Sequence, residues 1–304
     1  MCRLPGLNVS DKRKLKQSIL RRVVVDIKDL EHISPLFRGK FGPWILKRAM
    51  DIFGISRVNK LYGRSADYKG VEFTNHLLAD LGIKWGIGNA ERLNQLPKGA
   101  FITISNHPYG GLDGVMLVDL IATLRPKYKF MVNNLVYKAE AMQENFISVI
   151  PQKGNKRLNP MLDYRGIKET LMHLQQGHPV GFFPAGGVSL FDLKTMKVYD
   201  REWQTGILKI IQIAKVPVVP IRLFDLNSPF FYFLGVIDWR IRQVRMSYEL
   251  FNKGKKTHRI GIGETIQPEE LAGLKDLKEL EDYLRKAVYE MPLPKTFTPR
   301  ADLG

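Results

Sequence analysis

Apolar residues in the N-terminal part of the chain recur at helical spacing and are mixed with basic residues. Between Val9 and Leu30 this pattern predicts a basic amphipathic helix. After Pro35 a second segment, which continues to Phe53, mixes aromatic and aliphatic residues with Lys and Arg, as is typical of a helix in a bilayer interface. The two helices would equally suit a cap that packs its apolar face on the rest of the chain, and one hairpin can use both of its faces.

Beyond about Gly70, short apolar runs alternate with amphipathic stretches. The runs predict strands near 100–105, 128–133, 146–151, 179–183, 216–223 and 230–237, and the amphipathic stretches predict helices near 114–125, 163–177 and 202–214. Two more strand candidates, 243–251 and 258–263, have no helix between them and suggest an antiparallel edge, and a surface helix is predicted from 269 to 290. The alternation predicts an α/β fold with a mixed, mostly parallel sheet flanked by helices.

The change of pattern near residues 65–72 marks the candidate domain boundary. The 304 residues contain no internal repeat, low-complexity tract or flexible linker that would place a boundary elsewhere. We therefore expect a basic, amphipathic helical region for membrane association at 1–68 and an α/β domain at 69–304.

The chain is strongly basic and holds a single cysteine. Its 47 Lys and Arg against 30 Asp and Glu give a net charge of +17, which favours phosphate-bearing partners, whether nucleic acid or anionic lipid. Because Cys2 has no second cysteine to pair with, there is no internal disulfide and no cysteine-based metal site, which fits a reducing compartment. The N-terminus lacks the features of a secretory signal, and no apolar run reaches the roughly 18 residues of a membrane span.

The stretch from Asn106 to Gly114 holds the candidate chemistry, because it places His107 and Asp113 directly after a predicted strand. The imidazole can act as a general base while the carboxylate fixes its tautomer. On a regular helix, residues six apart would point about 120° away from each other, so the pairing requires a loop. Pro108 and the glycines that follow supply one. The alternative is a structural or superficial histidine.

This stretch, NHPYGGLDG, resembles the first signature of the glycerolipid acyltransferase family, which includes 1-acylglycerol-3-phosphate acyltransferases. The family's usual spacing is His-x4-Asp, whereas this chain has His-x5-Asp. The longer spacing is similar to that of a branch of lysolipid acyltransferases that includes the bacterial ornithine-lipid and glycine-lipid O-acyltransferases. Asn227 to Tyr232 adds to this likeness, although aromatic runs of this kind are more often core.

Three further stretches follow in the family's order. The run from Phe146 to Lys153 resembles the second signature, where the family often has an Arg that binds the acceptor phosphate; Lys153 is one of the nearby basic residues, and none is a clean match. The alternative for this stretch is a core strand followed by a solvated basic loop. The run from Val216 to Arg222 resembles the fourth signature and is most simply a buried strand. Arg222 could face an anionic headgroup or a surface carboxylate.

The third signature, Phe-Pro-Glu-Gly in the family, is here Phe-Pro-Ala-Gly, with Ala185 in place of the acid. The family's Glu is associated with organising a glycerol-phosphate acceptor, so its loss favours an aminolipid headgroup. The backbone N–H groups of Gly186 and Gly187, or the hydroxyl of Ser189, would then bind the headgroup. A plain strand-to-turn interpretation also explains Pro184 and the glycines.

The resemblance implies acyl transfer from acyl carrier protein or coenzyme A to the hydroxyl of a membrane lysolipid, with no metal and no bound cofactor. His107 would be the base and Asp113 its orienting partner. No Ser or Cys sits in a setting that would make it a nucleophile, so we expect no acyl-enzyme. The implied substrate-binding residues are Asn106, Gly110, Gly111, Lys153, Pro184, Gly186, Gly187, Ser189 and Arg222, and the amides of Gly110 and Gly186 are candidate oxyanion donors.

A lysolipid acceptor places the protein at an anionic membrane surface, and we expect a peripheral protein on the cytoplasmic face of the inner membrane, with no nucleic-acid partner. Three alternatives stay open. The acceptor could be lysophosphatidate. The chain could also bind nucleic acid, which its charge would suit although it has no recognisable nucleic-acid-binding motif. Finally, the loss of the acid at Ala185 is compatible with a lipid-binding relative that has no activity.

Overall fold

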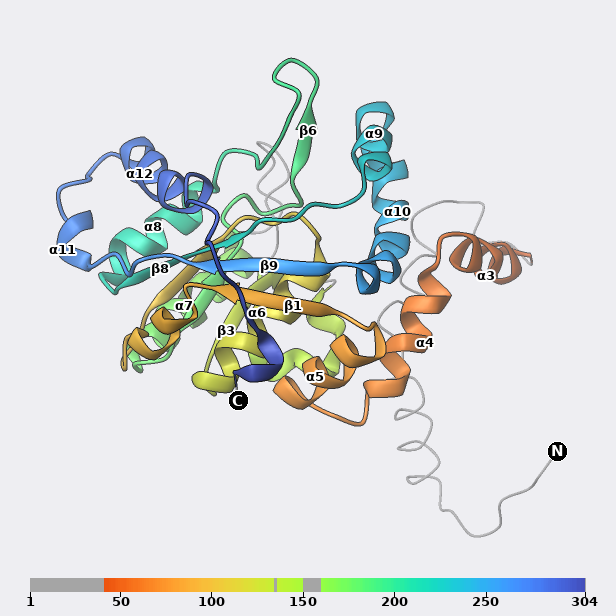
Figure 1. Cartoon of the computed structure of the whole chain (residues 1–304), viewed down its shortest axis with the longest axis horizontal. Coiled ribbons are helices and arrows are strands. Elements are labelled where there is room, and N and C mark those ends of the chain that lie inside the picture. Colours follow the sequence, from red (N-terminus) through yellow and green to blue (C-terminus); the bar gives the residue numbers. More distant parts are fainter. Residues whose placement is uncertain (1–40, 134–135, 150–159, 304) are drawn as a thin grey trace, which may run out of the picture.

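A central sheet of eight strands, covered by helices on its two faces, forms the body of the protein (Figure 1). The computed structural model describes residues 41–133, 136–149 and 160–303. The strand order is β10-β1-β9-β8-β2-β5-β3-β4. The strands are β1 (Lys84–Gly88), β2 (Ile102–Ser105), β3 (Lys129–Asn133), β4 (Phe146–Val149), β5 (Val180–Phe182), β8 (Val218–Leu223), β9 (Thr257–Ile262) and β10 (Thr298–Pro299), and a separate hairpin consists of β6 (Leu190–Asp192) and β7 (Lys197–Tyr199).

The helices connect and cover these strands. They are α3 (Gly42–Ile52), α4 (Ile55–Ser65), α5 (Gly70–Asp80), α6 (Gly111–Leu124), α7 (Pro160–Gln175), α8 (Thr205–Ala214), α9 (Pro229–Ile237), α10 (Trp239–Asn252), α11 (Pro268–Leu271) and α12 (Leu277–Tyr289). Short 3₁₀ helices add η2 (Ala90–Gln95), η3 (Val136–Lys138), η4 (Glu140–Asn145), η5 (Lys253–Lys255) and η6 (Arg300–Asp302). The predicted α/β fold with a mixed, mostly parallel sheet is confirmed.

The sheet is parallel over one part and mixed over the other. Strands β8, β2, β5, β3 and β4 run parallel to one another. Next to them β9 runs antiparallel to β8, β1 is parallel to β9, and β10 is antiparallel to β1. The predicted antiparallel strand at 258–263 is therefore present as β9. It is not at the edge, because β1 and β10 continue the sheet beyond it.

Two predicted strands are wrong: residues 230–237 and 243–251 lie in the helices α9 and α10. The hydroxyl of Ser228 accepts a hydrogen bond from the backbone N–H of Phe231, and Pro229 occupies the first helical turn, so the start of α9 is well capped. Along α9 the exposed residues Phe230, Phe233 and Ile237 follow a helical spacing, while Phe231 is buried. Because the run is apolar on both faces of the helix, its pattern does not distinguish this helix from the core strand that the sequence predicts.

Two apolar clusters, one of them around α6 and one around α8 and α12, make up the core. Helix α6 is buried nearly all round, packing against α5 and contributing Met116 and Leu117, among others, to the first cluster. In β2, Ile102 and Ile104 belong to the second cluster. The first turn of α6 is thereby fixed at the end of β2, which is where the site described below lies.

The predicted N-terminal helix at 9–30 lies outside the described residues, and α3 corresponds to the second predicted helix. One side of α3 is buried through Leu46 and Met50, whereas Trp44 and Ile52 are 63% and 65% exposed. None of the described helices has the length and apolar character needed to cross a bilayer. The division into regions 1–68 and 69–304 stays a prediction.

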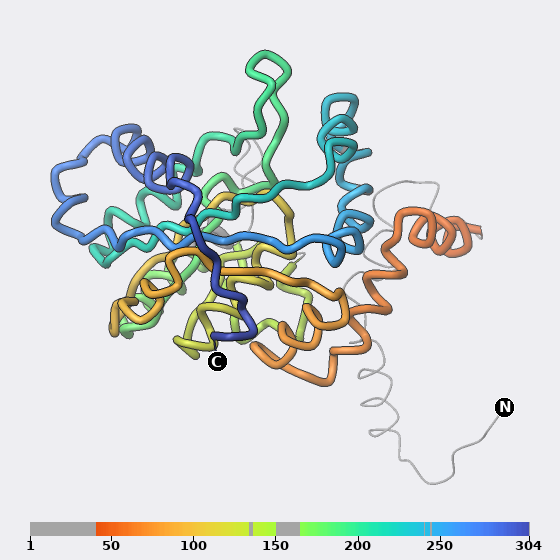
Figure 2. The backbone as a smooth tube through the Cα atoms, viewed as in Figure 1, coloured from red at the N-terminus to blue at the C-terminus, as the bar shows by residue number. Residues whose placement is uncertain are grey.

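Two pairs of elements rise from the same side of the sheet: the β6–β7 hairpin and the helical hairpin formed by α9 and α10 (Figure 2). They touch through β6 and α9. Both expose apolar side chains, with Leu193 and Met196 in the β hairpin, and Phe230, Phe233, Ile237, Trp239 and Ile241 in the helical hairpin. These two hairpins stand over the carboxyl ends of β2 and β5, next to the predicted site.

Candidate active site

The histidine loop, residues 106–110, connects β2 to α6 and brings His107 against Asp113. The distance from Nδ1 of His107 to Oδ2 of Asp113 is 2.9 Å. Gly110 ends the loop with φ of 87°, and α6 begins at the next residue, so Asp113 lies in the first helical turn. A carboxylate there can reach back over the turn, and this is how residues six apart meet.

Asp113 is held by more than the imidazole. Its Oδ2 also accepts hydrogen bonds from the backbone N–H of Tyr109 at 2.9 Å and of Gly110 at 3.1 Å. The side chain is fully buried. Burial raises the pKa of the Asp113 carboxyl, while the hydrogen bonds from His107 and the two amides act in the opposite direction. These three donors favour a carboxylate at Oδ2, which in turn orients the imidazole.

The imidazole of His107 is fixed from its face as well as its edge. Its ring stacks on Phe183 with centroids 3.9 Å apart and an angle of 17°. The side chain is 15% exposed, and no described residue forms a hydrogen bond with Nε2. With Nδ1–H donated to Asp113, Nε2 carries a lone pair and can accept a proton from a substrate hydroxyl.

The backbone of His107 has its own support, from a carboxylate that the sequence did not reveal. The N–H of His107 donates to Oδ2 of Asp200 at 3.2 Å, and its carbonyl accepts the N–H of Ser189 at 3.0 Å. Asp200 is buried, accepts the hydroxyl of Ser189 through Oδ1, and accepts the hydroxyl of Tyr289 at 2.7 Å. No motif marks Asp200, and only the fold brings it to the loop.

Several other elements hold the histidine loop. Nδ2 of Asn227 donates to the carbonyl of Pro108 at 2.8 Å. The hydroxyl of Tyr109 lies 2.9 Å from Nδ1 of His258, and Nζ of Lys253 lies 4.1 Å from the centroid of the Tyr109 ring. Met246 of α10 packs on Gly110, since a methyl group placed there would lie 2.8 Å from its sulfur. The loop is therefore anchored to the segment before α9, to α10, to η5 and to β9.

The third signature forms the Pro-Ala-Gly loop, residues 184–189, beside the histidine loop. The carbonyl of Pro184 accepts the N–H of Gln204, and Ala185 is buried in the second apolar cluster. Gly186, with φ of 64°, is exposed and Gly187 is half-buried. Ser189 lies closest to His107 through the backbone hydrogen bond given above. The structure thus brings this loop to the histidine, with Ala185 facing the core.

The two candidate oxyanion donors are already engaged. The N–H of Gly110 donates to Asp113, and the N–H of Gly186 donates to the carbonyl of Phe183 at 2.9 Å. Gly111 is exposed at the start of α6, with open space around its Cα. Its amide opens the helix, and helix N-termini attract negative charge.

Asn106, Arg222 and Lys153 are not part of this group of contacts. The side-chain amide of Asn106 exchanges two hydrogen bonds of 2.8 Å with the backbone of Leu223, which ties β2 to β8. Arg222 donates to the carbonyl of Met291 at 2.7 Å and lies over the Phe224 ring. Lys153 lies outside the described residues. Binding roles for these three residues stay predictions.

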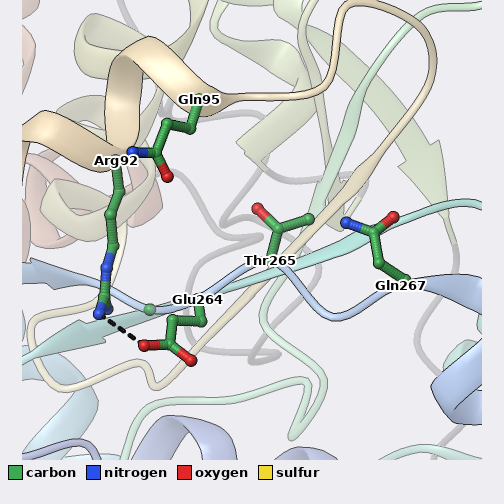
Figure 3. Close-up of a pocket in the computed structure, with 6 residues that line it drawn as sticks. Arg92, Gln95, Glu264, Thr265 and Gln267 are labelled. Carbon is green, nitrogen blue, oxygen red and sulfur yellow. Dashed lines mark hydrogen bonds and ion pairs between the residues drawn. The ribbon is translucent and has the colours of Figure 1, made fainter.

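A polar surface pocket lies elsewhere on the sheet (Figure 3). It is lined by Arg92, Gln95, Gly263, Glu264, Thr265 and Gln267, and Arg92 pairs with Glu264 at 3.0 Å. Ile266 pairs with Val218, the first residue of β8, whereas His107 comes two residues after Ser105, the last residue of β2. Because β8 and β2 are parallel, the pocket and His107 lie at opposite ends of these strands. Over the described part of the chain, no three His, Cys, Asp or Glu side chains gather as metal ligands would.

The chain is similar in sequence to known acyltransferases. The acyltransferase family profile matches residues 44–293, which include both loops and all their anchors. A lyso-glycine lipid O-acyltransferase of Bacteroides thetaiotaomicron is 28% identical over 242 residues, covering 77% of this chain and 85% of the relative. A protein of the same name from Phocaeicola vulgatus is 26% identical over 230 residues, covering 73% and 78% of the two chains. The resemblance found in the sequence is confirmed, and the chain belongs to the acyltransferase family.

Proposed function

We propose that the chain is an O-acyltransferase that moves a fatty acyl group from an acyl thioester to the hydroxyl of a lyso-glycine lipid. The observation that carries the proposal is the pairing of His107 with buried Asp113 at 2.9 Å, in a chain similar to two proteins named for this acceptor. The loss of the family's acid at Ala185 supports a headgroup other than glycerol phosphate.

The reaction needs one proton acceptor and no covalent intermediate. Nε2 of His107 removes the proton of the lysolipid hydroxyl as the oxygen attacks the thioester carbonyl. The new C–O bond forms, the C–S bond breaks, and the imidazolium returns its proton to the departing thiolate. Asp113 stabilises the imidazolium in between. Base catalysis of this kind contributes about 10²–10⁴-fold, and positioning of the two substrates contributes the rest.

The acceptor resides in a bilayer, and the surface of the protein suits one. Aromatic and aliphatic side chains of α3, α9, α10 and the β6–β7 hairpin are exposed, among them Trp44, Phe233 and Met196. The net charge of +17 would attract an anionic leaflet, with about 1 kcal/mol for each basic residue near the surface. We infer peripheral binding to the cytoplasmic face of the inner membrane. The same charge suits acyl carrier protein or the phosphates of coenzyme A as donor carrier.

The test is acyl transfer into vesicles that contain lyso-glycine lipid and lysophosphatidate together, with acyl carrier protein or coenzyme A as the carrier. We expect O-acylated glycine lipid as the main product. His107→Ala should reduce the product to background, and His76→Ala, which removes an exposed histidine of α5, should not. Product from lysophosphatidate alone would assign the other acceptor. No product with either carrier would contradict the acyl-transfer proposal, and sequence-independent binding to DNA would then favour the nucleic-acid alternative.

A further inference from the structure

Arg242 of α10 is a buried cation without a described counterion. Its side chain is 3% exposed, and the described residues place no carboxylate within ion-pair distance of it. Nη1 donates to the carbonyl of Ser189 at 3.0 Å, and Nε is buried without a hydrogen-bond partner among the described residues. A buried charge is costly unless an opposite charge compensates it. Arg242 therefore calls for an anion that the described residues do not supply.

Gly235 of α9 leaves room for the side chain of Arg242. A methyl group placed on Gly235 of α9 would lie 2.6 Å from Cδ of Arg242, so the arginine passes where any larger residue would block it. Its guanidinium lies 5.4 Å from the centroid of the Phe231 ring. The side chain is thus directed away from solvent, across α9, and toward the Pro-Ala-Gly loop.

A second arginine adds positive charge at the same place. Arg201 follows the β6–β7 hairpin and is exposed, and a methyl group placed on Gly187 would lie 3.9 Å from its Nη1. Burial lowers the pKa of Arg242, and the charge of Arg201 lowers it further. Two guanidinium groups that repel each other are most stable when an anion lies between or beside them.

Arg242 is linked to the backbone of the proposed base through one residue, Ser189. Ser189, which binds Arg242 through its carbonyl, donates its N–H to the carbonyl of His107 at 3.0 Å. Met246, one helical turn after Arg242 on α10, packs on Gly110 of the histidine loop. The face of α10 that carries Arg242 therefore covers the loop that carries His107.

We propose that Arg201 and Arg242 form a carboxylate-binding site that holds the headgroup of the acyl acceptor beside His107. The inference rests on the proposed function, since it names which part of that acceptor the arginines recognise. A free glycine headgroup ends in a carboxylate, whose two oxygens match the planar fork of a guanidinium. The phosphates of an acyl-coenzyme A donor share this anionic chemistry, so the experiment separates the two sources.

The experiment compares two acceptors, lyso-glycine lipid and its carboxamide, which differ only in the charge of the headgroup. For the unmodified protein we expect kcat/KM to be about 10–100-fold higher for the acid than for the amide. Arg201→Gln and Arg242→Gln should lower this ratio about tenfold or more, while the KM of the acyl donor stays unchanged. Lys209→Gln, which removes an exposed cation from α8, should leave the ratio unchanged.

Arg201 is exposed, so Arg201→Gln tests the site even if Arg242→Gln fails to fold. An unchanged acid-to-amide ratio in Arg201→Gln would overturn the proposal. A raised KM for the acyl donor together with an unchanged acid-to-amide ratio would also overturn the proposal. It would assign the arginines to the donor's phosphates. If the unmodified protein transfers no acyl group, calorimetric titration with soluble N-hexanoylglycine and its amide gives an independent readout. Acid-selective binding that Arg201→Gln abolishes would support the site even then, and equal binding of both would overturn it.

Discussion

Two buried aspartates bind the same histidine in different ways. Asp113 contacts the imidazole of His107, and Asp200 contacts its backbone N–H. Asp113 receives its remaining hydrogen bonds from amides of its own loop, whereas Asp200 also binds Ser189 and Tyr289, which lie in other parts of the fold. In the proposed mechanism the first carboxylate sets the protonation of the imidazole, and the second positions its backbone. The difference predicts separable effects on rate, pH dependence and stability.

Of these changes, Asp113→Asn should have the largest effect on kcat. An amide in place of the carboxylate can neither stabilise the imidazolium nor enforce the Nδ1–H tautomer, so we expect kcat to fall about 10²–10⁴-fold. The matched control is Asp119→Asn, since Asp119 is also buried on α6 but pairs with Arg300 at 2.8 Å. That control should lower Tm with activity retained. Equal activity losses in the two variants would show that Asp113 acts only through folding.

Asp200→Asn should reduce kcat/KM less, by about tenfold, because a small displacement of the base weakens catalysis without abolishing it. The pH profile should keep its shape, and Tm should fall because the buried hydrogen bonds to His107, Ser189 and Tyr289 are impaired. As a control, Asp192→Asn changes a carboxylate of β6 whose partners among the described residues are Lys194 and Thr195. It should change neither kcat/KM nor Tm. A change in the pH profile of Asp200→Asn would mean that Asp200 takes part in the proton transfer.

Gly110→Ala tests the loop between the two carboxylates. With φ of 87° and a methyl group 2.8 Å from the sulfur of Met246, alanine should destabilise the protein by about 1–3 kcal/mol. Gly111→Ala, at the start of α6 with open space around it, is the control and should change the free energy of unfolding little. Chemical denaturation measures the free energy of unfolding of each variant. Equal stability would contradict the tight packing of α10 on the loop.

Lys253 should give the smallest and the most pH-dependent effect. Burial lowers its pKa from 10.5 to about 8 in the folded protein. Above pH 8 the folded state loses this proton while the unfolded state keeps it, so the unfolded state binds more protons and stability rises with pH. Relative to Lys253→Met, the free energy of unfolding should rise by about 1 kcal/mol between pH 8 and pH 9. A difference that stays constant over this range would show that the pKa is not lowered.

The sequence predicted the elements whose signals are local. The strands that became β2, β3, β5 and β8 are short apolar runs, and the break of helical pattern at Pro108 and the glycines indicated the loop in which His107 meets Asp113. Strands β1 and β10 were missed, since Lys84–Gly88 is short and glycine-rich and β10 has two residues. Because β1 and β10 are not predicted, the sequence predicts β9 as the edge of the sheet.

The aromatic run after Ser228 shows how a local signal can mislead. Phe230 to Ile237 has the composition of a strand, and the deciding features were Ser228 and Pro229 directly before it. Ser228 is itself fixed by Glu249 of α10, whose Oε1 accepts the serine hydroxyl at 2.6 Å. Contacts across the fold also explain why the sequence did not predict roles for Asp200 and Arg242. Both act on residues that are far away in the sequence, and neither belongs to a motif.

The β6–β7 hairpin begins and ends at the two residues that hold the backbone of His107. Ser189, directly before β6, binds the carbonyl of His107, and Asp200, directly after β7, binds its N–H. The hairpin thus connects an exposed apolar tip, with Leu193 and Met196, to the partly buried His107. We therefore expect any displacement of the tip to act directly on the two hydrogen bonds that position the backbone of His107.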